Sequence, residues 1–200
     1  MNVLNVLKSS VVAGICIGIA GIGFLATRDI IGSVLFAFAL LSVVAYKLYL
    51  YTGTAGFIKK GELPLLLLVF AGNIAGCLLM SLLARLSPMP LQESAQNILE
   101  GRLAMGPLHG GLLSIACGFI MTTAVTFARK GNNLPLLFGV PLFITCGYPH
   151  CMADAFFYLC VPLDFWIAHL GSILSFYVCI VLGHLVGCNS YRMVVGSKPE

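Results

Sequence analysis

The chain has 200 residues, of which 60% are hydrophobic and only 9% are charged, and its formal net charge is +4. A mean hydropathy of +1.02 lies far outside the range of soluble globular domains and excludes that class. We therefore expect an all-α, multi-pass membrane protein that forms a single transmembrane domain over residues 1–200. The small net charge gives no indication of a nucleic-acid partner, and no cofactor is expected.

The apolar residues form six segments, each long enough to cross a hydrocarbon core of about 30 Å, which requires about 20 residues per helix. These segments cover residues 9–27, 30–51, 63–84, 103–127, 134–161 and 164–188. The first lacks a convincing cleavage site, so we expect a spanning helix and not a removed signal peptide. Residues 87–102 carry Leu91, Ala95, Ile98 and Leu99 near helical spacing, which predicts a short amphipathic helix on the outer surface.

The basic residues predict the orientation of the spans, because Lys and Arg are enriched in cytoplasmic loops. Three basic residues fall on one face, Arg28, Arg85 and Arg102, and seven on the other, Lys8, Lys59, Lys60, Arg129, Lys130, Arg192 and Lys198. Both termini are therefore predicted to be cytoplasmic. Lys47 falls inside the second span, where its side chain is expected either to snorkel to the cytoplasmic interface or to face a pore.

The second and fifth spans contain residues that a continuous helix avoids. Residues 52–56 of the second read TGTAG, and residues 145–154 of the fifth read TCGYPHCMAD, with a glycine and a proline at mid-segment. Glycine loosens a helix and proline removes a hydrogen-bond donor, and backbone freed at membrane depth must be buried in protein or line a wet cavity. We therefore predict two broken helices.

Breaks in corresponding spans of two halves are typical of transporters built from inverted repeats. Residues 72–77 (GNIAGC) and 183–188 (GHLVGC) share a pattern in the third and sixth spans. The predicted organisation is one repeat over about 9–86, a connecting segment at 87–102 and a second repeat over about 103–190. The spaced glycines also predict close helix packing, independently of any repeat.

Eight cysteines lie in apolar runs, so they are expected to be free packing residues and not a disulfide framework. Cys146, His150 and Cys151 are close in sequence, but no further Cys or His residues join them. No metal site is therefore expected.

Residues 147–154 (GYPHCMAD) resemble the Gly-Phe-Glu-His-Ser-x-Ala-Asn pattern in the fifth span of the formate/nitrite transporter family. Residues 49–52 (YLYT) resemble its second-span Glu/Asp-Leu-Phe-Thr, and residues 72–76 its Gly-Asn-x-x-Gly. The resemblance covers about residues 9–190. It implies an aquaporin-like protomer with one pore, a homopentamer, the inner (plasma) membrane of a prokaryote, and conduction of small monovalent weak-acid anions such as formate, nitrite, hydrosulfide or short carboxylates.

The chain also departs from the family patterns. Tyr49 stands where the family has an acidic residue, Asp154 where it has the Asn after the central histidine, and His184 where it has the sixth-span Asn. The chain is shorter than is usual for the family. These differences indicate a divergent, compact member, in which the substrate is harder to infer than the fold.

By position, the resemblance implies two hydrophobic constrictions around a central histidine, His150. The outer constriction would contain Phe36 and Leu40, and the inner one Leu50, Tyr51 and Phe143. We expect basic mouths to attract the anion and the constrictions to remove its water. His150, held by the Thr52 hydroxyl, then donates a hydrogen bond or a proton, because an isolated anion is costly in a dry pore whereas its protonated acid is not.

Asp154 follows His150 by one helical turn, so the two side chains are expected to share a helix face. An ionised carboxylate there would repel anions unless Lys47 or another cation compensates its charge. Among the other histidines, His184 is the strongest pore candidate because it occupies the repeat-equivalent motif position, whereas His109 is a weaker one and His169 is expected near a helix end.

Two other functions remain open at this point. The first is a pore for a small neutral or cationic solute on the same fold, although the paired Asn-Pro-Ala signature of water channels is absent. The second is a membrane enzyme in which His150 and Asp154 form an acid/base pair. The enzyme is disfavoured because the sequence has no serine in a nucleophile elbow and no nucleotide-binding loop.

Overall fold

The computed structural model describes residues 2–59 and 61–196, and over these ranges it is helical with no strand, as the sequence predicts. Lys60 and Lys198 lie outside the described residues. The helices, in chain order, are α1 (Val3–Thr27), α2 (Ile30–Ala45), α3 (Tyr51–Ala55), α4 (Leu63–Ala84), α5 (Leu91–Met105), α6 (Pro107–Arg129), α7 (Leu134–Thr145), α8 (Cys151–Cys160), α9 (Leu163–Ala168) and α10 (Leu170–Val195).

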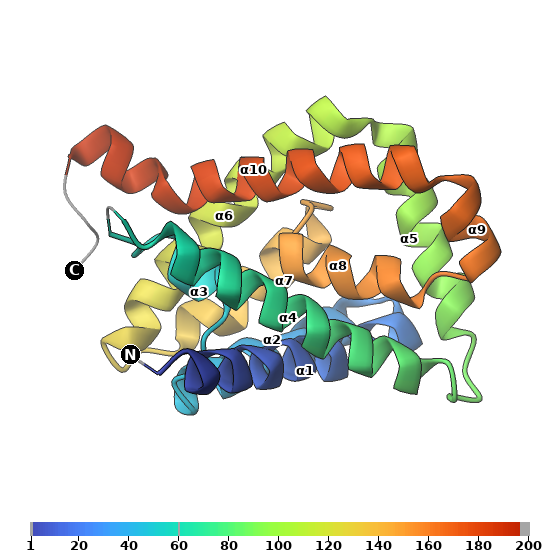
Figure 1. Cartoon of the computed structure of the whole chain (residues 1–200), viewed down its shortest axis with the longest axis horizontal. Coiled ribbons are helices and arrows are strands. Elements are labelled where there is room, and N and C mark those ends of the chain that lie inside the picture. The colour runs from blue at the N-terminus through green and yellow to red at the C-terminus, as the bar shows by residue number, and fades with distance from the viewer. Residues whose placement is uncertain (1, 60, 197–200) are drawn as a thin grey trace.

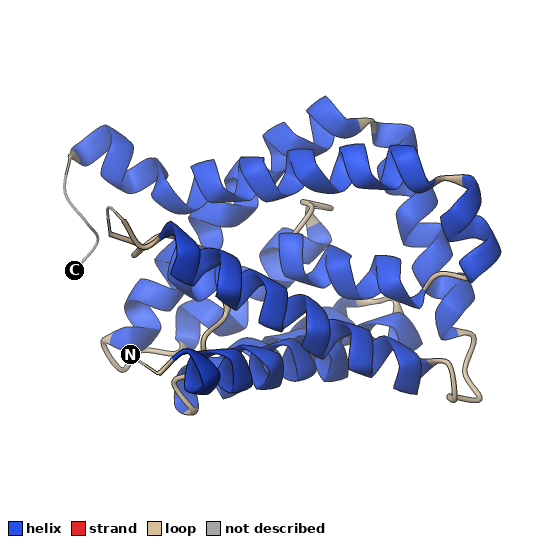
Figure 2. Cartoon of the chain, viewed as in Figure 1, coloured by secondary structure: helices blue, strands red, loops and turns tan. Residues whose placement is uncertain are grey.

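Two kinds of helix form the bundle. Helices α1, α4, α6 and α10 have 22 to 26 residues and are apolar enough to cross a membrane. Helices α2, α7 and α8 are shorter and apolar, and loops separate α2 from the five-residue α3 and α7 from α8 (Figure 2). Each half of the chain therefore contributes a long helix, an interrupted pair and a second long helix, and α1 and α6 run in opposite directions (Figure 1). This arrangement is that of two inverted three-helix repeats.

Polar residues and prolines set the helix ends. The side chains of Asn2 and Asp29 accept hydrogen bonds from the backbone N–H groups of Leu4 and Gly32, at 3.0 and 2.9 Å. Such caps satisfy donors that the first helical turn leaves free. Helices α4, α6 and α7 begin instead with a proline in the first turn, where its missing N–H has no helical acceptor to lose.

Two boundaries differ from the sequence-based expectation. The interruption of the second span lies at residues 46–50 and not at residues 52–56, because Thr52 and Gly53 belong to α3. The break needs no glycine there, because Lys47 adopts the left-handed conformation with φ of 53°. The sixth apolar segment is divided at His169 into α9 and α10, so this histidine does lie at a helix end.

Close glycine contacts seat α4 on α1 and α10 on α6. A Cβ atom on Gly76 would collide with the backbone carbonyl of Val11, and a Cβ atom on Gly183 would collide with the carbonyl of Gly111. These contacts confirm the close packing that the glycine spacing predicts.

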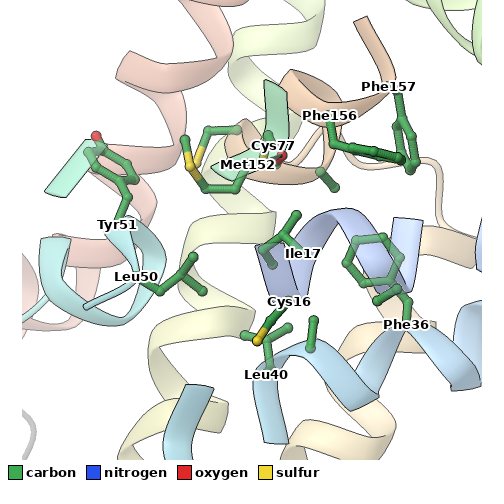
Figure 3. Close-up of a cluster of buried hydrophobic side chains, with 14 of the residues drawn as sticks. Cys16, Ile17, Phe36, Leu40, Leu50, Tyr51, Cys77, Met152, Phe156 and Phe157 are labelled. Carbon is green, nitrogen blue, oxygen red and sulfur yellow. Dashed lines mark hydrogen bonds between the residues drawn. The ribbon is translucent and has the colours of Figure 1, made fainter. Parts of the chain in front are cut away.

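Helix α8 is the most enclosed element of the bundle. Nine of its ten residues are buried, and Figure 3 shows Met152, Phe156 and Phe157 among side chains from α1, α2 and α4. His150 immediately precedes this helix and is itself 1% exposed. The fold therefore carries a histidine into the interior of an apolar bundle.

The connection between the halves is the predicted amphipathic helix, α5. Its buried residues are Leu91, Ala95 and Leu99, all within the apolar stripe that the sequence shows. It contacts α1, α6 and α8, so it is part of the bundle and not only a linker. It lies at the end opposite to both chain termini (Figure 1).

We expect Gly76→Ala to lower the free energy of unfolding by roughly 1–3 kcal/mol, because the new methyl group has no space between α1 and α4. Gly23→Ala is the matched control: its Cβ would meet no atom within 4 Å, and alanine favours a helix. Thermal unfolding in detergent measures both, and equal melting temperatures for the two variants would contradict the packing argument.

Candidate conduction site

Both interrupted pairs break with the same backbone geometry. Lys47 and Gly147 have positive φ values of 53° and 68°. The next residue in each case, Leu48 or Tyr148, donates its N–H to the carbonyl five positions earlier, at 2.9 Å. Glycine adopts this conformation freely, whereas a residue with a Cβ does so at a cost of about 1–2 kcal/mol.

Asn73 of α4 satisfies the backbone at the first break. Its Oδ1 accepts from the Tyr51 N–H at 2.7 Å, and its Nδ2 donates to the carbonyls of Tyr49 and Ser10, at 3.0 and 2.8 Å. Backbone groups freed inside a membrane require such partners. The sequence identifies Asn73 through its motif, but this structural role was not predicted.

At the second break, the ion pair of Arg102 and Asp154 satisfies the freed backbone groups. Arg102 of α5 donates from Nη1 to the Gly147 carbonyl at 2.6 Å and from Nε to Asp154 Oδ1 at 2.9 Å. The other carboxylate oxygen, Asp154 Oδ2, accepts from the His150 N–H at 2.6 Å. The carboxylate is 1% exposed and the guanidinium side chain 14%. Arg102, and not Lys47, is therefore the cation that compensates Asp154.

From the sequence alone, Arg102 is expected only to mark one membrane face. A signal was nevertheless present, because Arg102 follows Leu99 by three residues and continues the stripe through Leu91 and Ala95. A basic residue at the end of a buried stripe indicates a buried partner. Asp154 is the acidic residue within the predicted fifth span, so it was the natural partner for Arg102.

His150 is the N-cap residue of α8, and both of its ring nitrogens have partners. Nδ1 accepts from the Ala153 N–H at 3.1 Å, and Nε2 lies 3.2 Å from Thr52 Oγ1. Because Nδ1 is an acceptor, the neutral ring carries its proton on Nε2 and donates it to the Thr52 hydroxyl. Phe143 stacks on the imidazole with 5.0 Å between ring centroids.

His184 of α10 lies edge-on to His150, with 4.9 Å between the ring centroids. Its side chain is fully buried. Neither of its nitrogens has a hydrogen-bond partner within the described part of the chain. Two imidazoles therefore meet at the interior of the bundle, one fully hydrogen-bonded and one not.

Two cavities approach this pair of rings from opposite ends of the bundle. The terminal cavity, at the end that carries both chain termini, has a volume of about 520 Å³ and reaches Leu40 and Leu50. The opposite cavity has a volume of about 340 Å³ and reaches Phe36, Phe143 and His150. No described residue lines both cavities.

Each cavity contains two basic residues and one acidic residue. Lys47, Arg129 and Glu62 line the terminal cavity, and Arg129 is held over the ring of Phe57 at 3.7 Å. The opposite cavity is lined by Arg28 and by the Arg102–Asp154 pair. Both approaches therefore carry a net positive charge, which attracts anions.

The cavities group the predicted constriction residues differently from the expectation. Leu40 accompanies Leu50 on the terminal cavity, whereas Phe36 accompanies Phe143 on the opposite one. Phe36 and Leu40 share one face of α2 but lie one turn apart along its axis, so Leu40 is nearer the cavity at one end of the bundle and Phe36 is nearer the cavity at the other. Tyr51 lines neither cavity and packs against Phe70, with 5.2 Å between ring centroids.

The remaining candidates lie away from this centre. His109 and His169 are exposed. Cys146 is also exposed, and all eight cysteines are free thiols, six of them buried. Within the described residues, no three His, Cys, Asp or Glu side chains gather so as to hold a metal ion.

Fold and site together define a helical membrane protein of the transporter type, with two interrupted helices that meet at a buried polar centre. The family model described as Formate/nitrite transporter matches residues 1–194, and the chain belongs to this family. The formate channel FocB of Escherichia coli (strain K12) is 25% identical over 150 residues, which are 66% of this chain and 52% of that protein. The match therefore spans about half the length of this relative.

Solved structures share the fold. A "pentameric formate channel with formate bound" superposes with a TM-score of 0.77 and 20% identity, covering 97% of this chain and 96% of that one. An "FNT family ion channel" superposes with a TM-score of 0.73 and 21% identity, covering 98% and 90%. The arrangement of the helices is therefore the same in proteins whose sequences have diverged widely.

We expect Arg102→Met to destabilise the protein by roughly 3–5 kcal/mol, because it leaves the Asp154 carboxylate buried without its cation. Adding Asp154→Asn to this variant removes the unpaired charge and restores part of the stability. Arg28→Met is the control, since Arg28 lines the same cavity and donates to the Ser94 carbonyl but pairs with no carboxylate in the described residues. If the double variant melts no higher than Arg102→Met, charge compensation is not the role of the pair.

We expect Lys47→Gly to raise the melting temperature, because glycine adopts the left-handed conformation of this position at about 1–2 kcal/mol less than lysine. Lys47→Met removes the same charge and keeps the strain. A melting temperature raised equally in both variants would assign the effect to charge and not to the backbone.

Proposed function

We propose that this protein is a channel for small monovalent weak-acid anions, such as formate, nitrite, hydrosulfide or short carboxylates. The observation that carries the proposal is the buried His150–Thr52 contact between two cavities with basic linings. Membership of the formate/nitrite transporter family supports it, as does the likeness to a formate channel.

The basic side chains concentrate the anion at both cavities. Lys47 and Arg129 act at the terminal cavity, and Arg28 acts at the opposite one, where Arg102 is already paired with Asp154. Because exposed charges are screened over about 8 Å at physiological ionic strength, this attraction operates within the cavities and weakens in high salt.

The apolar sections then separate the anion from water. Leu40 and Leu50 form the section on the terminal side, and Phe36 and Phe143 form the one on the opposite side. An unpaired charge is costly in such a section. A hydrogen-bond or proton donor at the centre removes this obstacle, since the protonated acid carries no charge.

His150 is that donor in the proposed mechanism. Its one N–H, on Nε2, faces the Thr52 hydroxyl in the resting protein. An arriving anion takes this N–H in place of the hydroxyl, and Thr52 then donates its own O–H to the anion. A second proton on the imidazole would require Nδ1 to release the Ala153 N–H, so capping of α8 and protonation of His150 compete.

The protein is proposed to function as a homopentamer in the inner membrane of a prokaryote, with one pore in each protomer and both termini in the cytoplasm. One structural neighbour is a pentameric formate channel, which supports the proposed assembly. The described basic residues are consistent with the orientation, because Arg28 and Arg85 lie at one end of the bundle and Lys59, Arg129 and Arg192 near the other. The family and its solved neighbours are transporters or channels, which favours transport over an enzyme.

In proteoliposomes, we expect formate or a related weak acid to cross, with a flux that rises as the external pH is lowered from about 8 to about 5. The reason is that a larger share of the weak acid is then in its protonated, uncharged form, which crosses an apolar section at less cost than the anion. The panel includes formate, nitrite, hydrosulfide, acetate and lactate, together with urea, ammonium and glycerol. Flux confined to the last three would replace the anion channel by a pore for neutral or cationic solutes.

We expect His150→Asn to lower weak-acid flux about tenfold to a hundredfold, as the loss of a hydrogen bond to a charged group implies. Asparagine is chosen because it retains the N-cap of α8, whereas alanine would remove the cap together with the imidazole. His109→Asn, at an exposed position, is the control. Flux and pH dependence of His150→Asn that equal those of the wild type would show that the imidazole takes no part in conduction.

A further inference from the structure

His184 is a buried polar group that the fold leaves without a hydrogen-bond partner. The imidazole is 0% exposed, and Nδ1 and Nε2 are both unpartnered within the residues that the structure describes. An unsatisfied buried donor or acceptor carries a full desolvation penalty, so such groups in native proteins mark a site whose partner comes from elsewhere. The stability of the fold alone gives no reason for a histidine at this position.

A comparison with Asn73, at the matching motif position in the first half, shows how His184 differs. Residues 72–77 (GNIAGC) and 183–188 (GHLVGC) occupy the same place in the two halves, so Asn73 and His184 correspond. Asn73 uses its whole amide to hold the first break, with three hydrogen bonds to backbone groups. At the second break, Arg102 and Asp154 hold the backbone, and His184 takes no part. The ring is thus released from the structural role of its counterpart.

The position of the ring suits contact with a permeant. His184 lies 4.9 Å from the ring of His150, which lines the opposite cavity. It lies 6.4 Å from the ring of Tyr51, and Leu50, the residue before Tyr51, lines the terminal cavity. The histidine that has free nitrogens therefore sits in the closed section between the cavities, beside a histidine whose nitrogens are both engaged.

We propose that His184 is a second permeant-contacting histidine, and that the two rings together hold the weak acid at the centre of the pore. A neutral imidazole offers one N–H donor and one lone-pair acceptor. A protonated oxyacid offers the complementary pair, an O–H donor and an oxygen acceptor, and hydrosulfide offers an S–H and a lone pair. This inference rests on the proposed channel function and narrows its substrate class to species that both donate and accept.

The same chemistry disfavours permeants that only accept hydrogen bonds. Chloride and nitrate have no hydrogen to donate to the acceptor nitrogen of a neutral imidazole. Protonation of His184 would bury one positive charge beside the neutral ring of His150, with no carboxylate to compensate it, because the Asp154 carboxylate is held by the His150 backbone and by Arg102. The titratable side chains on the elements around the two rings include Tyr51 of α3, Arg102 of α5, Cys117 of α6, Cys151, Asp154, Tyr158 and Cys160 of α8, and Tyr177, Cys179 and Cys188 of α10.

The test is His184→Asn, measured for flux and for stability in the full-length protein. We expect formate flux at low pH to fall about threefold to tenfold, the loss of one or two hydrogen bonds to the permeant, with a flatter pH profile. We also expect an equal or higher melting temperature, because asparagine fits this position in the other half and removes a buried unpaired imidazole. The selectivity for formate over chloride falls in the same variant.

Three results would overturn the inference. One is a His184→Asn variant with wild-type flux, selectivity and pH profile, and another is a flux loss matched by an equal loss of thermal stability, which assigns His184 to packing. The third is failure of both His184→Asn and the larger His184→Gln to assemble. His109→Asn controls for the loss of a histidine. A wild-type protein that conducts no weak acid at all would instead remove the proposed function, which the wild-type panel measures separately.

Discussion

Backbone hydrogen bonding inside the bilayer is the constraint on which the rest of this structure depends. Two helices are interrupted inside an apolar bundle, and the N–H and C=O groups that they release need partners within the protein. The protein meets this requirement differently in its two halves, with the amide of Asn73 at the first break and the Arg102–Asp154 pair at the second. Both breaks are therefore held by side chains from neighbouring helices, and the polar centre of the protein exists because of them.

The two halves therefore carry chemically different side chains at their breaks. Equivalent positions carry Leu50 and His150 at the starts of the resumed helices, and Asn73 and His184 on the glycine-rich helices. The first half supplies an apolar residue and a structural amide, whereas the second supplies two imidazoles. Because Arg102 of α5 binds the backbone at the second break, the side chain at position 184 is not needed to do so. A connecting segment between repeats has thereby become part of the site.

The energetics of this centre follow from burial. The Arg102–Asp154 pair is nearly enclosed, so each charge depends on the other and on the backbone groups that it binds. His184, in contrast, retains unsatisfied nitrogens at some expense of stability. Proteins that violate the rule of satisfied buried polar groups usually do so where they bind or react. Apolar walls lower the local dielectric and so strengthen the hydrogen bonds made at this centre.

Much of the architecture was present in the sequence. Composition establishes the membrane class, because so few charged residues cannot cover the surface of a soluble protein. The apolar segments and the amphipathic connection follow from local periodicity, and the central place of His150 follows from resemblance to the family motif. Three features were decided only by the tertiary structure: the position of the first break at residues 46–50, the pairing of Arg102 with Asp154 across 52 positions, and the isolation of His184. Local patterns could not give them, because each depends on which side chain from a distant helix reaches a given backbone or ring atom. Sequence spacing determines what a residue offers, and only the packing of the helices determines what it meets.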